Sequence, residues 1–186
     1  MRDEVTRAAA RRATLVAVPV ALLAGVLVFW LLSHAGRPAP VSTATPGPAA
    51  TGPVEMAAPP LADRAATLCR ALVLGLPDAL GRHARRPVTA GAAQNAAYGD
   101  PPITLACAAG PAPSVAPDAQ LLNVSGVCWG TEQLADRSVW TTVDREVPIT
   151  VTVPQAYEGP SQQVIDFTDP IIATVPRTAS PPTGCG

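Results

Sequence analysis

Hydrophobic and polar positions follow three different patterns along the chain. Residues Thr14 to Leu32 form an apolar run without a charged residue. Residues 33–60 are rich in Pro and Ala and show no periodicity. From Leu61 onward the apolar positions show a helical spacing, then a period of two, and then a helical spacing again. This succession predicts a membrane helix, an extended linker and one folded domain at residues 61–186.

The apolar run has the length of a transmembrane helix. Its 19 residues would span roughly 28 Å as a helix, close to the hydrocarbon thickness of a bilayer. Four arginines against two acids in residues 1–13 predict a cytoplasmic tail, with everything after Ser33 outside. The alternative is a cleaved signal peptide, because small residues precede a candidate cleavage site after Ala35. Cleavage there would make the protein secreted.

The folded part is predicted to be an α+β domain, with a small antiparallel sheet and helices packed on one face. Helical spacing predicts helices at Leu61–Leu76 and Val164–Val175, and a brief helix at Ala90–Ala97. Pro170 is expected to kink or restart the last helix. Alternation predicts strands at residues 103–107, 121–129, 139–143 and 147–154. Because Pro148 and Pro154 lack an N–H, the last strand is expected either at a sheet edge or with an interrupted ladder.

Charge and composition exclude some function classes. The 186 residues carry a net charge of −1, all 13 basic residues are Arg, and the pI is about 6.1. A nucleic-acid partner is therefore not expected, because such binding needs a basic face. The mean hydropathy of +0.24 is too high for a disordered polar chain. An Ala-, Pro- and Arg-rich chain without Lys indicates a genome of high GC content.

Four cysteines in an exported domain favour two disulfides. Cys69 lies on the apolar face of the first predicted helix, and Cys107 ends a strand that this helix should cover. We therefore predict Cys69–Cys107, which leaves Cys128–Cys185. The cysteines form no C-x-x-C pair, so no zinc site is expected.

The densest charge cluster contains Arg82, Arg85 and Arg86, in a domain that is otherwise acidic. Arginine forks match phosphate oxygens, so the cluster is a candidate docking patch for an anionic cell-wall polymer or lipid headgroup. The alternative is that these charges complement a helix dipole. Further candidate binding residues are Asp100, Trp129 and Arg145, although a tryptophan on a strand is more often part of the core.

Catalytic constellations are scarce. His83 is the sole imidazole of the domain, and Asp166 with Asp169 is the closest pair of acids in the last helix. No nucleophile elbow, metal-binding H-E-x-x-H or phosphate-binding loop is present. We therefore expect no enzyme activity, metal or cofactor. The favoured function is a membrane-anchored extracytoplasmic binding or interaction module of the cell envelope, with an anionic cell-wall polymer or an envelope protein as its partner. The alternatives are an unrecognised envelope hydrolase and a structural subunit of a membrane assembly.

Several short strings, taken in order, resemble an uncharacterised actinobacterial family, domain of unknown function 3515. They are Arg85-Arg86-Pro87-Val88, the stretch Tyr98 to Ile103 with Leu105 and Cys107, Gly126-Val127 with Trp129, Thr141-Thr142 with Arg145, and the Val-rich strand ending at Pro154. Ala106 and Cys128 depart from the family pattern. The resemblance covers Leu61 to Val175 and implies a secreted or membrane-anchored protein without an assigned activity.

The predicted topology is testable by labelling. A cysteine introduced at Thr51 should react in intact cells with a membrane-impermeant thiol reagent, because the chain is outside from Ser33 onward. Labelling only after lysis would contradict this topology. A mature N-terminus at Gly36 would replace the anchor with a cleaved signal peptide.

Overall fold

The computed structural model describes residue 23, residues 25–30, residues 51–116 and residues 118–185. The chain divides into two units, residues 1–47 and 48–186. In the first unit, residues 25–30 are helical. Most of the predicted span at 14–32, the tail at 1–13 and the linker up to residue 50 lie outside the described residues. Within the described residues, no helix has the length and apolar character needed to cross a membrane.

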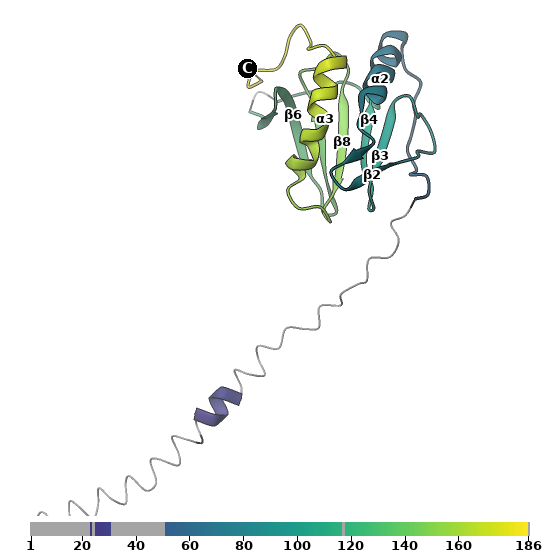
Figure 1. Cartoon of the computed structure of the whole chain (residues 1–186). Coiled ribbons are helices and arrows are strands. Elements are labelled where there is room, and N and C mark those ends of the chain that lie inside the picture. The colour runs from purple at the N-terminus through teal and green to yellow at the C-terminus, as the bar shows by residue number, and fades with distance from the viewer. Residues whose placement is uncertain (1–22, 24, 31–50, 117, 186) are drawn as a thin grey trace, which may run out of the picture. The chain divides into compact units, whose positions relative to one another are not determined.

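The second unit is an α+β domain with one eight-stranded antiparallel sheet (Figure 1). Its helices are α2 (Asp63–Gly75) and α3 (Pro160–Thr174). Its strands are β1 (Ala79–Leu80), β2 (His83–Arg86), β3 (Asn95–Tyr98), β4 (Ile103–Cys107), β5 (Leu121–Val124), β6 (Val127–Gln133), β7 (Arg137–Thr142) and β8 (Ile149–Pro154). The strand order is β1-β2-β3-β4-β8-β7-β6-β5, so two four-stranded meanders are joined through β4 and β8. The predicted fold class is confirmed, and the sheet is larger than expected.

Both helices pack on the same face of the sheet. Alternate residues of β4 and β8, including Leu105 and Val151, point to this face and are fully buried. Phe167 of α3 packs edge-on against Tyr98 of β3 with ring centroids 5.8 Å apart. In Figure 1, α3 crosses in front of β6 and β8, and α2 packs beside α3. The opposite face carries no helix among the described residues.

The first predicted helix is confirmed, whereas three predicted elements differ from the structure. The expected brief helix at 90–97 is wrong, because Asn95–Tyr98 pairs along its whole length with β4 as a strand. The expected strand at 121–129 is two strands, separated by a tight turn at Ser125 and Gly126, which have positive φ angles of 48° and 83°. The C-terminal helix does not restart at Pro170, since α3 continues through it.

The edge position expected for the last strand is wrong. β8 lies in the middle of the sheet and pairs with β4 on one side and β7 on the other. Pro148 precedes the strand and Pro154 is its last residue, so neither removes a donor from the middle of a ladder. The carbonyl of Pro148 still accepts a hydrogen bond from the N–H of Ala108, at 2.8 Å.

The folded unit begins before Leu61, inside the expected linker. Val54 is buried and forms a parallel bridge with Val88. Its N–H donates to the carbonyl of Pro87 at 2.8 Å, and its carbonyl accepts from the N–H of Thr89 at 2.9 Å. The side-chain amide of Asn95 donates to the carbonyl of Ala57 at 2.9 Å. Residues 51–60 therefore belong to the domain rather than to an extended spacer.

The structure contains the predicted disulfides Cys69–Cys107 and Cys128–Cys185, each with Cα atoms 5.5 Å apart. The first joins α2 to the centre of the sheet. The second joins β6 to the C-terminal tail. All four cysteines are buried.

We expect the double variant Cys128→Ser/Cys185→Ser to lower the free energy of unfolding by about 2–4 kcal/mol, because the bond closes a long loop in the unfolded chain. Urea unfolding followed by fluorescence measures this loss, and non-reducing peptide mapping checks the pairing itself. A map that links Cys69 to Cys185 would contradict the connectivity.

Candidate functional site

A cavity of about 400 Å³ gathers most of the predicted binding residues at one corner of the sheet, and we call it the Arg82 pocket. The turn between β1 and β2 forms one wall, and the turn that follows β3 forms another. Gly81, with a φ of 54°, allows the first of these turns. The lining residues are Thr51, Arg82, His83, Ala84, Arg85, Arg86, Pro87, Gly99 and Asp100.

Arg85 and Arg86 are neighbours in the chain but point to opposite faces of β2, because side chains alternate along a strand. Arg85 lies opposite the buried Tyr98, on the face that carries the helices. Its Nη2 donates to the carbonyl of Val73 in the last turn of α2, at 3.2 Å. The dipole-complementing role considered as the alternative therefore fits Arg85, with α2 as the helix.

Arg86 is committed to backbone carbonyls on the other face. Its Nη2 donates to Gly52 at 2.8 Å and its Nη1 to Gly99 at 2.9 Å. The carboxylate of Asp100 lies 3.7 Å from Nη1, and the Arg86 side chain is only 12% exposed. Arg86 thus fastens the entering chain to the turn after β3, which is a structural role.

Arg82 is the exposed cation of the pocket, at the tip of the β1–β2 turn. Next to it, His83 packs edge-on against the ring of Tyr157, with centroids 4.9 Å apart. The Tyr157 hydroxyl donates to the carbonyl of Pro101 at 2.6 Å. Burial, and then the charge of Asp100, raise the pKa of Tyr157 above its ordinary value. The phenol therefore stays neutral and keeps this hydrogen bond at physiological pH.

Gly99 is needed for this arrangement. Its φ is 70°, and a Cβ at this position would lie 2.7 Å from the Tyr157 hydroxyl and 3.1 Å from Nδ1 of His83. His83 and Tyr157 therefore approach the Gly99 backbone more closely than any larger residue at this position would allow.

Two predicted binding residues, Trp129 and Arg145, do not line the Arg82 pocket, so their predicted binding role is wrong. Trp129 is fully buried on β6 and packs edge-on against Trp140, with centroids 6.4 Å apart, so it belongs to the core. The Arg145 side chain is 3% exposed, and its Nη2 donates to the carbonyl of Gly126 at 2.7 Å. Together with Arg177 it neutralises the fully buried carboxylate of Asp144.

The Asp144 cluster fastens the C-terminal tail. The Asp144 carboxylate also accepts a hydrogen bond from the N–H of Cys128, at 3.1 Å. Nη2 of Arg177 donates to the carbonyl of Cys185 at 3.0 Å. A buried carboxylate needs such partners, since an unpaired one would strongly destabilise the fold. Arg145 is therefore a structural residue.

The sequence did not reveal a groove of about 590 Å³ on the face of the sheet without helices, which is larger than the Arg82 pocket. The Pro-rich loop before β5 forms one wall, and Gly130, Val139 and Thr141 form part of the floor. The only feature of the sequence that points to this groove is the Pro-rich composition of the loop. A groove of this kind needs two distant segments to meet, so periodicity alone does not reveal it.

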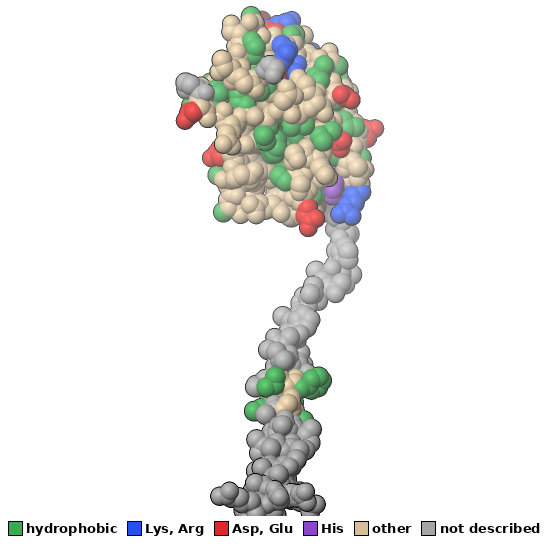
Figure 2. Space-filling view, turned by 90° about the vertical axis from the view of Figure 1, so that its left-hand side faces the viewer, with side chains coloured by type: hydrophobic (Ala, Val, Ile, Leu, Met, Phe, Trp, Pro, Cys, Tyr) green, Lys and Arg blue, Asp and Glu red, His purple; other side chains and the backbone are tan. Residues whose placement is uncertain are grey.

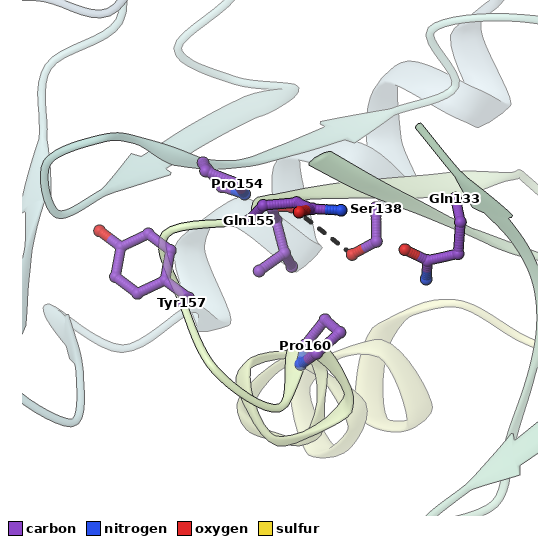
Figure 3. Close-up of a pocket in the computed structure, with 7 residues that line it drawn as sticks. Gln133, Ser138, Pro154, Gln155, Tyr157 and Pro160 are labelled. Atoms are coloured by element: carbon purple, nitrogen blue, oxygen red, sulfur yellow. Dashed lines mark hydrogen bonds between the residues drawn. The ribbon is translucent and has the colours of Figure 1, made fainter. Parts of the chain in front are cut away.

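A smaller cavity of about 140 Å³ lies where the end of β6, the start of β7 and the end of β8 meet the start of α3 (Figure 3). Gln133 and Ser138 lie across from Pro160 in this view. Ser138 accepts a hydrogen bond from the Trp140 indole at 3.1 Å. Its lining contains no carboxylate, histidine or lysine.

Among the described residues, no three His, Cys, Asp or Glu side chains cluster as metal ligands would. Asp166 and Asp169 are exposed on α3.

Comparison with known proteins returns one match. No curated protein and no solved structure matches the chain. A family model matches residues 16–180, which is most of the chain, and its description is "Protein of unknown function (DUF3515)". The chain belongs to the DUF3515 family.

Proposed function

We propose that the protein is a membrane-anchored, extracytoplasmic binding module of the bacterial cell envelope that takes an anionic, phosphate-bearing component at the Arg82 pocket. The observation that carries this proposal is the pocket's composition. Three arginines and one carboxylate line a single cavity. The guanidinium of Arg86 is held by the backbone carbonyls of Gly52 and Gly99, so the pocket combines one fixed cation with the exposed Arg82.

Two further features support the location. The uncharged run at residues 14–32 follows an Arg-rich segment, as in a membrane anchor whose N-terminus is cytoplasmic. The two buried disulfides fit an oxidising compartment, because cytosolic proteins rarely keep structural disulfides.

An envelope hydrolase is the second candidate, because His83 and Asp100 line the same cavity. An imidazole and a carboxylate are a common pair for general acid–base chemistry. If this candidate is right, the protein will release orthophosphate from a phosphate polymer, and a His83→Ala variant will not.

We expect the Arg82→Gln variant to bind long-chain polyphosphate about fivefold more weakly than the native protein at low salt, the value of one exposed ion pair. The difference should shrink as salt rises, because exposed charges are screened. Isothermal titration of the full chain in detergent measures this. Arg82→Gln should leave the urea midpoint unchanged, since Arg82 is exposed.

The matched control is Arg70→Gln, which removes one exposed cation from α2, outside the pocket. Equal weakening by both variants would contradict the pocket and indicate a response to net charge alone. Arg86→Gln is not a suitable probe, because it would release Gly52 and Gly99. Vesicles of phosphatidylglycerol in place of polyphosphate distinguish a lipid headgroup from a polymer as the source of phosphate.

A further inference from the structure

The sheet has two edges that differ in how well they are protected. β1 at one edge has only two residues. β5 at the other edge has four residues and a neighbour on one side only. Its sequence, Leu-Leu-Asn-Val, contains no proline and no charge. Natural proteins usually place proline or charged residues on exposed edge strands, because an open edge can pair with a strand of another chain.

The turn after β5 determines which backbone groups face outward. Ser125 and Gly126 form a two-residue hairpin loop between the paired residues Val124 and Val127. In such a hairpin the closing pair is hydrogen-bonded, and the pattern then alternates along the strand. Leu122 and Val124 therefore bond to β6, while Leu121 and Asn123 direct their N–H and C=O groups to the open side.

Exposed apolar side chains flank this open edge. Leu122 is 45% exposed on β5, and Ile165 and Ile172 are 45% and 46% exposed on α3. A Cβ built on Gly126 would lie 3.7 Å from Cδ1 of Ile172, so this flank of the helix adjoins the β5–β6 turn. Figure 2, which views the molecule from this side, shows hydrophobic side chains gathered in the middle of the face, with charged ones at the margins.

We infer that a second copy of this chain pairs with β5 antiparallel, around a two-fold axis at Leu122. In this register Leu121 of each copy lies opposite Asn123 of the other copy. Each of these two pairs exchanges two backbone hydrogen bonds, which gives four in total. The two Leu122 side chains then form a close non-hydrogen-bonded pair on the helix-bearing face. An uncharged strand has no like-charge repulsion at the axis, so the edge is self-complementary.

The pairing is weak in dilute solution and depends on the tether. Four residues of strand and three apolar side chains per copy bury less than the roughly 1,200 Å² typical of a stable interface. Confinement of both copies to one membrane raises their effective concentration. The expected extent of pairing therefore rests on the proposed membrane anchoring, and the experiment measures membrane association separately from cross-linking.

The test is cysteine cross-linking of the full chain reconstituted in phosphatidylcholine vesicles. Two facing residues of a non-hydrogen-bonded pair have Cα atoms about 4.5 Å apart, within reach of a disulfide. Leu122→Cys should therefore give a covalent dimer under mild copper–phenanthroline oxidation. Val124→Cys should give no covalent dimer. In this register the two copies of Val124 are offset by four residues along the strand, which places them about 14 Å apart.

Leu74→Cys, on an exposed side chain of α2, measures random collisions between anchored copies. Dimer formation by Leu122→Cys at least fivefold above both controls supports the inference. Dimer formation equal to Leu74→Cys overturns it, provided that flotation shows the chain on the vesicles. Failure to float contradicts the anchoring instead. Peptide mapping of each variant checks that the two native disulfides are intact, so a misfolded variant is recognised.

Discussion

The ladder between β4 and β8 is the interaction on which the rest of the domain depends. Each meander pairs only with itself except at these two strands, where residues 104–107 lie opposite 149–152. The residues of this ladder that face the helices are fully buried, and both helices pack over them. The Cys69–Cys107 disulfide attaches α2 to this same central strand. Without the ladder, neither meander would bury its apolar face.

Local sequence patterns predicted which segments form helices and strands better than they predicted where each strand lies in the sheet. Alternation from Val147 to Val153 was sufficient to identify β8 as a strand. Its central position depends on pairing with two strands that are distant in sequence, and two terminal prolines suggested the opposite. At residues 95–98, an Ala-rich stretch has no clear period, and pairing with β4 determines its conformation. The disulfides were predictable because an apolar helix face and a strand end constrain which cysteines can meet.

The arginine cluster shows why sequence proximity is a weak guide to a site. Adjacent residues on a helix or in a loop can share a surface, but adjacent residues on a strand cannot. The guanidiniums of Arg85 and Arg86 therefore lie on opposite faces of the sheet, although both residues line the Arg82 pocket, which also brings together Thr51 and Asp100 from distant parts of the chain. Arg145 is a comparable case: the buried carboxylate of Asp144, the residue before it, explains its charge. Neither the strand assignment of 83–86 nor the burial of Asp144 follows from composition.

The way in which the chain enters the domain has a mechanical consequence. A pull transmitted from the N-terminal side reaches the domain at Thr51 and first loads the Arg86–Gly52 hydrogen bonds and the bridge between Val54 and Val88. If these give way, the segment up to α2 can peel from the sheet without breaking a covalent bond. At Cys69 the peeling stops, because the disulfide transfers the force to β4 in the middle of the sheet. The domain thus has a short extensible leader ahead of a covalently locked body, which would absorb strain before its folded core is loaded.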